Sequence, residues 1–117
     1  MRIALFGKPF KQKHNDAVQH LVDRIQGLDS EALVYVEFMD LLKKSTEVPS
    51  TFKTFSCAGD IEGYDVLFSV GGDGTFLESC TLASEKGVPI MGINTGTLGF
   101  LSNVGTDSID VAIDAII

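Results

Sequence analysis

Hydrophobic residues in this chain occur in two kinds of run, which alternate along it. Short continuous runs of β-branched and aromatic residues are typical of buried strands, whereas hydrophobic residues spaced three and four apart indicate one face of a helix. These runs predict strands at 2–6, 32–38, 65–70 and 89–93, and helices at 15–28, 39–44, 75–86 and 107–117.

Strands that alternate with helices favour an α/β fold. We expect a mostly parallel, Rossmann-like sheet with helices on both faces and right-handed crossovers, built as one domain of 117 residues. Residues 45–60 are expected to form a loop with at most one ragged strand. Phe52 and Phe55 in that loop either form a flap over a ligand or pack beneath the loop, which is the commoner case.

Short polar residues mark where the helices begin. Asn15 or Asp16 is suited to cap the first helix, and Thr75 the third, because such side chains accept hydrogen bonds from the free amides of a first turn. Asp107 or Ser108 has the same place before the last helix. The buried face of the third helix is expected to carry Phe76, Cys80 and Ala83.

The chain is acidic, with 9 Lys and Arg against 16 Asp and Glu and a net charge of −7. This balance argues against nucleic acids and anionic membranes as partners. Residues 1–14 nevertheless hold four basic side chains and no acid, which suits a phosphate-bearing small molecule or a solvated loop. The four are Arg2, Lys8, Lys11 and Lys13.

The two cysteines, Cys57 and Cys80, lack the spacing of a metal or redox motif, so we predict no metal-ligating residues and reduced thiols in a cytoplasmic protein. No hydrophobic run is long enough to span a bilayer. The start of the chain reads as a first strand rather than a signal peptide. His14 falls in a loop, and His20 lies among polar neighbours and is expected to face solvent.

The most informative stretch is 66–77, a buried strand that runs into a turn with three glycines around one aspartate, Asp73. Free backbone amides at the start of the following helix would form an anion site, and phosphate is the usual anion there. A carboxylate beside bound phosphates is unfavourable unless it accepts a proton or holds a cation. The alternative is a tight turn without a ligand. The candidate residues of this turn are Gly71, Gly72, Asp73, Gly74 and Thr75.

A second glycine-rich turn, at 94–101, follows the strand predicted at 89–93. Asn94, Thr95 and Thr97 offer neutral hydrogen-bonding groups there. Three hydrophobic side chains in this turn either pack against a nucleobase or fill the core. These are Leu98, Phe100 and Leu101.

Several common catalytic motifs are absent from the chain. It has no Walker A sequence, no Gly-x-Ser-x-Gly and no His-Glu-x-x-His, and the dinucleotide fingerprint at 72–77 lacks its third glycine. The remaining chemistry is phosphoryl transfer, in which a carboxylate accepts the proton of an attacking hydroxyl and a divalent cation neutralises the phosphates.

The pair of turns resembles the ATP-NAD kinases. The first turn, Gly-Gly-Asp-Gly-Thr-Phe-Leu at 71–77, is shared with diacylglycerol kinases and sphingosine kinases and, loosely, with 6-phosphofructokinases. The second turn, Gly-Ile-Asn-Thr-Gly-Thr-Leu-Gly-Phe-Leu at 92–101, points to NAD kinase. The resemblance extends over essentially the whole chain, so residues 1–117 are expected to form the N-terminal α/β domain of that family. The resemblance implies transfer of the γ-phosphate of ATP, or of polyphosphate, to the 2′-hydroxyl of the adenosine ribose of NAD, giving NADP.

The resemblance also assigns roles to residues. Asp73 matches the proton acceptor and, with Gly74, the pair that contacts NAD. Magnesium is expected, bound mainly through the nucleotide phosphates. Gly71, Gly72 and Thr75 match the turn that cradles phosphate, and Thr97, Leu98 and Phe100 match the turn that lines the adenine pocket.

The family continues into a β-rich C-terminal domain with an Asn-Glu or Asn-Asp pair that also holds NAD. We find no such domain after Ile117, and therefore expect the isolated chain to be catalytically incomplete and its apolar last helix to favour self-association. Members of the family commonly form dimers and tetramers. The alternatives are a lipid or sugar kinase of the same superfamily and a non-catalytic nucleotide-binding module.

Overall fold

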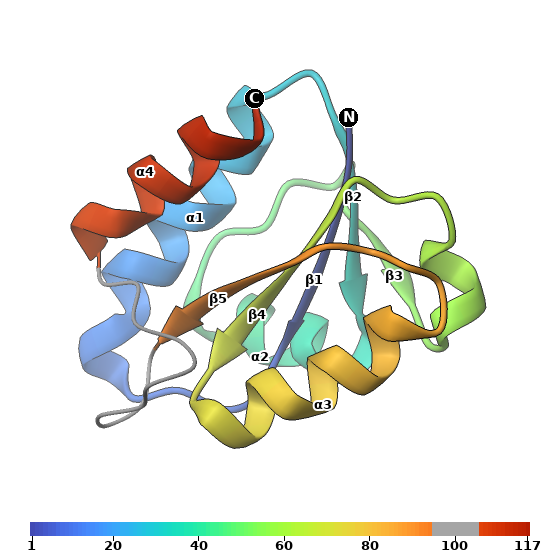
Figure 1. Cartoon of the computed structure of the whole chain (residues 1–117). Coiled ribbons are helices and arrows are strands. Elements are labelled where there is room, and N and C mark those ends of the chain that lie inside the picture. Colours follow the sequence, from blue (N-terminus) through green and yellow to red (C-terminus); the bar gives the residue numbers. More distant parts are fainter. Residues whose placement is uncertain (95–105) are drawn as a thin grey trace.

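The computed structural model describes residues 1–94 and 106–117 as a single sheet flanked by helices (Figure 1). The strands are β1 (Arg2–Gly7), β2 (Glu31–Tyr35), β3 (Lys53–Phe55), β4 (Val66–Gly71) and β5 (Ile90–Asn94). The α-helices are α1 (Asn15–Gly27), α2 (Val36–Ser45), α3 (Asp73–Ser84) and α4 (Thr106–Ile116), with short 3₁₀ turns η1 (Gln12–His14) and η2 (Ala58–Ile61).

The sheet has the order β3-β2-β1-β4-β5, and every pairing in it is parallel. The predicted α/β fold is therefore confirmed. Successive connections run outward from β1 toward β3 and then from β4 toward β5, so the chain changes direction between β1 and β4. A crevice opens at the carboxyl ends of the strands at such a switch point, which is where ligands bind in this architecture.

The two faces of the sheet are covered unequally (Figure 1). Side chains of α1, α2 and α4 share one core with Ile3 and Leu5 of β1. Ala4 and Phe6, which alternate with them, pack on the other face with η2 and the buried Ala83 of α3. Phe52 and Phe55 are both buried, as expected for packing beneath the loop.

The boundary between β2 and α2 differs from the prediction. The strand expected at 32–38 ends at Tyr35, and α2 begins at Val36. Phe38, Met39 and Leu42 lie at helical spacing and are all buried. Packing of this face on the core therefore outweighs the strand preference of the aromatic and β-branched residues that come before it.

The buried face of α3 was predicted correctly at Ala83 and wrongly at Phe76 and Cys80. Phe76 and Cys80 are only half-buried, whereas Thr75, Ser79 and Ala83 are buried. Ser79 Oγ lies 2.8 Å from Ser69 Oγ on β4 and 2.9 Å from the Thr75 carbonyl oxygen. A row of small side chains lets α3 approach β4 closely, and the hydroxyl pair satisfies polar groups that would otherwise be buried without a partner.

Helix α4 is joined to α1 by a cluster of charged side chains. Arg24 donates hydrogen bonds to Asp110 at 2.5 Å and to Asp114 at 2.9 Å, and His20 Nε2 lies 2.7 Å from the same Asp110 oxygen. The His20 side chain is 39% exposed, so it faces solvent in part, as expected, while it also takes part in this cluster. The His20 hydrogen bond, followed by Arg24, lowers the pKa of the Asp110 carboxyl.

Replacing Asp110 with asparagine is expected to lower the melting temperature of the chain by a few degrees at pH 7. Because its pKa is lowered in the folded state, Asp110 stabilises the fold above its ordinary pKa of about 4, and this contribution is lost as the pH falls through the folded pKa. The gap in Tm between wild type and variant, measured by circular dichroism, should therefore close in acid. Asp40→Asn, an exposed carboxylate on α2, is the control. A gap that persists unchanged to pH 3 would contradict this account.

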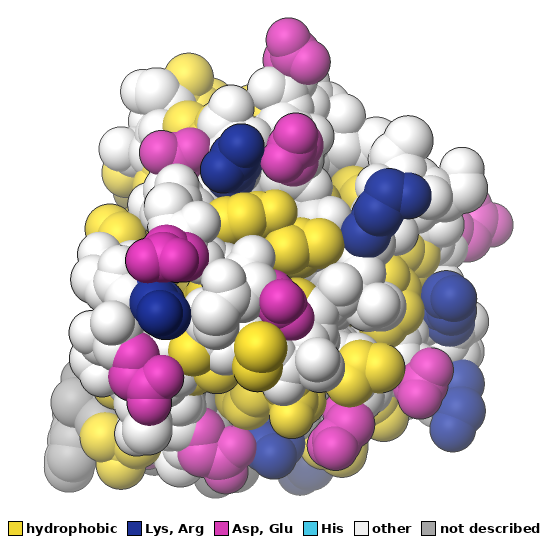
Figure 2. Space-filling model, turned by 90° about the vertical axis from the view of Figure 1, so that its right-hand side faces the viewer, with side chains coloured by type: hydrophobic (Ala, Val, Ile, Leu, Met, Phe, Trp, Pro, Cys, Tyr) yellow, Lys and Arg dark blue, Asp and Glu magenta, His cyan; other side chains and the backbone are white. Residues whose placement is uncertain are grey.

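The surface seen from the right of Figure 1 is mixed in character (Figure 2). Among the described residues on this face, acidic and basic side chains are interspersed with hydrophobic ones. In the part of the chain that the structure describes, no helix has the length and hydrophobicity needed to cross a bilayer.

Candidate functional site

The candidate site lies at the carboxyl ends of β1 and β4, beside the switch point (Figure 1). The last residue of β1, Gly7, is paired with Val70, and the Lys8 amide donates a hydrogen bond to the Val70 carbonyl oxygen at 3.2 Å. The chain leaves β4 at Gly71 and enters α3 at Asp73. The segment after β1 and the turn after β4 are therefore neighbours.

Gly71 and Thr75 fix the shape of the turn. Gly71 has a φ of +156°, and a Cβ atom at this position would lie 2.5 Å from Thr75 Oγ1. Thr75 was predicted to cap α3, but the capping residue is Gly72, which has no side chain to accept a bond. Thr75 is instead a buried residue of the first helical turn, because packing against the backbone of Gly71 holds it under the turn.

The start of α3 presents the backbone amides of its first turn, which is the arrangement that binds anions at helix N-termini. The Phe76 amide donates the first hydrogen bond of the helix, to the Gly72 carbonyl oxygen at 3.0 Å. The amides of 73–75 precede that bond and therefore lie outside the hydrogen-bond ladder of the helix. Gly72 and Gly74 have ordinary φ, and a Cβ atom on either would meet nothing within 4 Å. Packing does not require glycine at these two positions, and the missing side chains leave the backbone open.

Asp73 is the first residue of α3 and is half-buried. A negative side chain is favoured at this end of a helix by the helix dipole. The structure therefore brings the predicted carboxylate and the predicted phosphate-binding amides into one turn of the chain.

The second predicted turn is described only at its start. Asn94 ends β5 and is paired with Gly71 across the β4–β5 ladder, so its backbone lies beside the first turn. Thr97, Leu98 and Phe100, with Thr95 and Leu101, lie outside the described residues.

The basic residues of 1–14 do not form a single edge. Arg2 is at the opposite end of β1, where its amide donates to Asp65 at 2.7 Å and its guanidinium lies 3.5 Å from Glu31. Lys8, in contrast, follows the carboxyl end of β1. The extended backbone of a strand explains the error: each residue advances the chain by about 3.3 Å, so Arg2 and Lys8, six residues apart, lie roughly 20 Å apart along β1.

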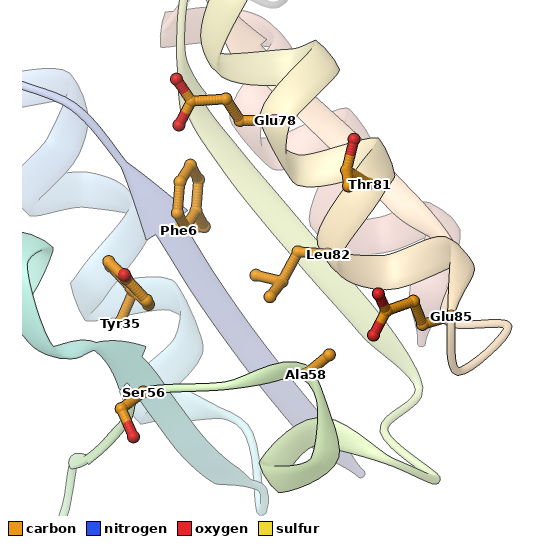
Figure 3. A pocket seen from close by; sticks show the side chains of 8 residues that line it. All are labelled: Phe6, Tyr35, Ser56, Ala58, Glu78, Thr81, Leu82 and Glu85. Atoms are coloured by element: carbon orange, nitrogen blue, oxygen red, sulfur yellow. The ribbon is translucent and has the colours of Figure 1, made fainter.

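A cavity of about 350 Å³, which sequence reasoning missed, lies along α3 beyond the turn at 71–75, and none of its described lining residues belongs to that turn (Figure 3). Its walls come from β1, β2, α3 and the segment after β3, which lie far apart in the sequence. Phe6 and Tyr35 form an aromatic wall, with ring centroids 5.0 Å apart. The lining residues are Phe6, Tyr35, Ser56, Ala58, Glu78, Thr81, Leu82 and Glu85.

The described side chains of the candidate site could contact a magnesium ion that is already bound to the phosphates of a nucleotide, but they do not form a metal site by themselves. Within residues 1–94 and 106–117, no three or more His, Cys, Asp or Glu side chains form a group that could hold a metal. Magnesium typically keeps several waters and is bound through one or two carboxylates plus substrate phosphates. Asp73 fits that role beside a nucleotide, and it does not form an all-protein cage.

Residues 6–117 match a family model described as the ATP-NAD kinase N-terminal domain. The chain belongs to this family. It is 38% identical to an NAD kinase of Cytophaga hutchinsonii over 118 residues, and 31% identical to one of Flavobacterium psychrophilum over the same length. An NAD kinase of Bacteroides fragilis is 31% identical over 116 residues.

The chain spans about 40% of the length of each of these curated relatives, while 99–100% of the chain itself is covered. The family match includes every predicted site residue, from Gly71 to Phe100. ATP-NAD kinase membership therefore agrees with the resemblance inferred from the two turns.

Proposed function

We propose that this chain is the phosphate-cradling part of an NAD kinase, which transfers the γ-phosphate of ATP, or a phosphate of polyphosphate, to the 2′-hydroxyl of the adenosine ribose of NAD. The observation that carries the proposal is the glycine turn at 71–75, where a carboxylate and the first backbone amides of a helix lie together at the switch point. Family membership supports the choice of ATP and NAD as substrates.

In the proposed reaction, Asp73 accepts the proton of the ribose hydroxyl as that oxygen attacks the terminal phosphorus. A new O–P bond forms, the bond to the leaving phosphate oxygen breaks, and ADP or a shortened polyphosphate departs. Amides of the turn at 71–75 hold phosphate oxygens and stabilise charge that grows in the transition state. Magnesium, when bound with the nucleotide, neutralises phosphate charge.

Further residues are assigned to the acceptor. We propose that Asn94 binds the nucleotide through hydrogen bonds and that Thr97, Leu98 and Phe100 line the adenine pocket. We also propose that the activity needs the region of the relatives beyond the matched part, so the 117-residue chain alone forms little NADP. The complete enzyme is proposed to be a cytoplasmic dimer or tetramer.

The test is NADP formation by the full-length product of the gene that encodes this chain, with ATP or polyphosphate, magnesium and NAD. The 117-residue chain runs beside it. We expect the full-length protein to form NADP and the 117-residue chain to form little or none. Diacylglycerol, sphingosine and fructose 6-phosphate are offered as competing acceptors, and phosphorylation of one of these in place of NAD would favour the lipid or sugar kinase alternative.

A further inference from the structure

Lys8 follows β1 at the edge of the phosphate turn, and its backbone is held firmly. Its amide is bonded to Val70, the residue just before Gly71. On either side of Lys8 the chain rests on Phe38: a Cβ on Gly7 would come within 2.5 Å of the Phe38 ring, and the Phe10 and Phe38 rings are 6.3 Å apart. The root of the Lys8 side chain is therefore fixed beside the turn.

The Lys8 ammonium is held near the turn by α3. Its Nζ atom lies 3.1 Å from Glu78 Oε2 and 5.6 Å from the centroid of the Phe6 ring. Glu78 comes five residues after Asp73, about 7.5 Å along the helix axis. A lysine has a flexible four-carbon stem, so the same ammonium can reach either the carboxylate or a ligand at the start of α3.

The ion pair is open enough to exchange partners. The Lys8 and Glu78 side chains are 44% and 55% exposed, and pairs this exposed contribute little to stability. The cavity of about 350 Å³ is lined by Phe6 and Glu78, so there is space beside the pair for a side chain to move (Figure 3).

The segment that follows Lys8 is positive in character. Lys11 and Lys13 lie within it, and η1 ends at His14. Burial, followed by the charges of Lys13 and Lys11, lowers the pKa of His14. The charges of Lys11 and Lys13 would attract an anion to this segment, whereas the burial of His14 disfavours a charge of either sign.

We propose that Lys8 binds the polyphosphate chain of the phosphate donor and that Glu78 holds its ammonium beside the turn until the donor arrives. This proposal rests on the proposed kinase function and adds a donor-binding residue to it. The donor brings several negative charges in place of one carboxylate, and charge-assisted bonds from lysine to phosphate are among the stronger hydrogen bonds. ATP and inorganic polyphosphate share this chemistry.

The test compares two variants that break the same ion pair. In the full-length gene product, Lys8→Met should raise the KM for ATP by roughly 10- to 100-fold while the KM for NAD changes less than about twofold. Glu78→Gln removes a competitor for the ammonium, so the KM for ATP should fall by roughly two- to fivefold. Lys8→Arg should restore most of the affinity for ATP, and Lys44→Met on α2 is the control.

If the pair only joined β1 to α3, both variants would raise the KM for ATP alike, and that result would overturn the proposal. Lys8→Met should impair ATP and polyphosphate equally as donors. A defect with ATP alone would place Lys8 on the nucleoside and would also overturn it.

Failure of the proposed function is distinguishable from failure of this inference. If the full-length protein forms no NADP, binding of magnesium–ATP and of inorganic tripolyphosphate is measured by calorimetry. Weaker binding of both to Lys8→Met than to wild type would still support the role of Lys8. Equal affinities, or no binding to either protein, would exclude it.

Discussion

Full-length protein that carries Asp73→Asn is expected to form NADP at least about 100-fold more slowly than wild type, the lower bound typical for loss of a general base. Asparagine keeps nearly the same size but cannot take the ribose proton. The fall should appear in kcat, because the amides of 71–75 that cradle phosphate remain, so the KM for ATP should change little. NADP formation is measured with saturating ATP and NAD.

Two controls make this result interpretable. Asp16→Asn removes an exposed carboxylate from the first turn of α1, a chemically matched position, and should leave the rate unchanged. Thermal unfolding of Asp73→Asn is recorded beside the assay, so that a folding defect is not mistaken for a catalytic one. A folded variant that forms NADP at the wild-type rate would show that Asp73 is not the proton acceptor, whereas wild-type protein that binds nucleotide without forming NADP would favour the non-catalytic module.

Gly71→Ala is expected to destabilise the chain by about 2–5 kcal/mol, the sum of a strained φ and of overpacking against Thr75. The φ of +156° is one that side chains rarely allow, and the added methyl would lie 2.5 Å from Thr75 Oγ1 and 2.7 Å from its Cβ. Relief requires the turn to shift, which also moves Asp73. Urea unfolding followed by circular dichroism gives the free energy.

Gly72→Ala is the matched control, one residue along the same turn. A methyl group there meets nothing within 4 Å, and the backbone is in the extended region. We expect a loss of about 1 kcal/mol, which is typical when alanine replaces a favoured residue at the capping position of a helix. Equal destabilisation by the two alanines would show that the contact with Thr75 is not what fixes glycine at position 71.

Sequence periodicity was enough to predict the fold class because the core face of α1 and the buried strands have regular hydrophobic patterns. Val18, Leu21, Val22 and Ile25 recur at spacings of three and four along α1, and all four are buried. Periodicity failed where packing opposes propensity, as at the start of α2, and where small polar residues take core positions. Nothing in the pattern marks Ser79 as buried, because its partner Ser69 is supplied by another element.

The part of the candidate site that is continuous in sequence could be predicted, and the part assembled from separate elements could not. Glycines around Asp73 are a local signal, so the turn and its carboxylate could be found from the sequence. The pair of Lys8 and Glu78 could not, since the two residues lie on separate elements brought together by the order of strands in the sheet. Arg2 was misassigned for a different reason: it begins β1, and the length of the extended strand separates it from Lys8, which follows the other end.

The contact between Gly7 and Phe38 has a consequence for how this family can vary. A side chain at position 7 and an aromatic ring at position 38 compete for one volume, since a Cβ atom at 7 would come within 2.5 Å of the ring. The two positions are therefore constrained to change together: related chains with alanine or serine at 7 should carry a smaller residue at 38. Covariation between them would record the requirement that the backbone entering Lys8 keep its place.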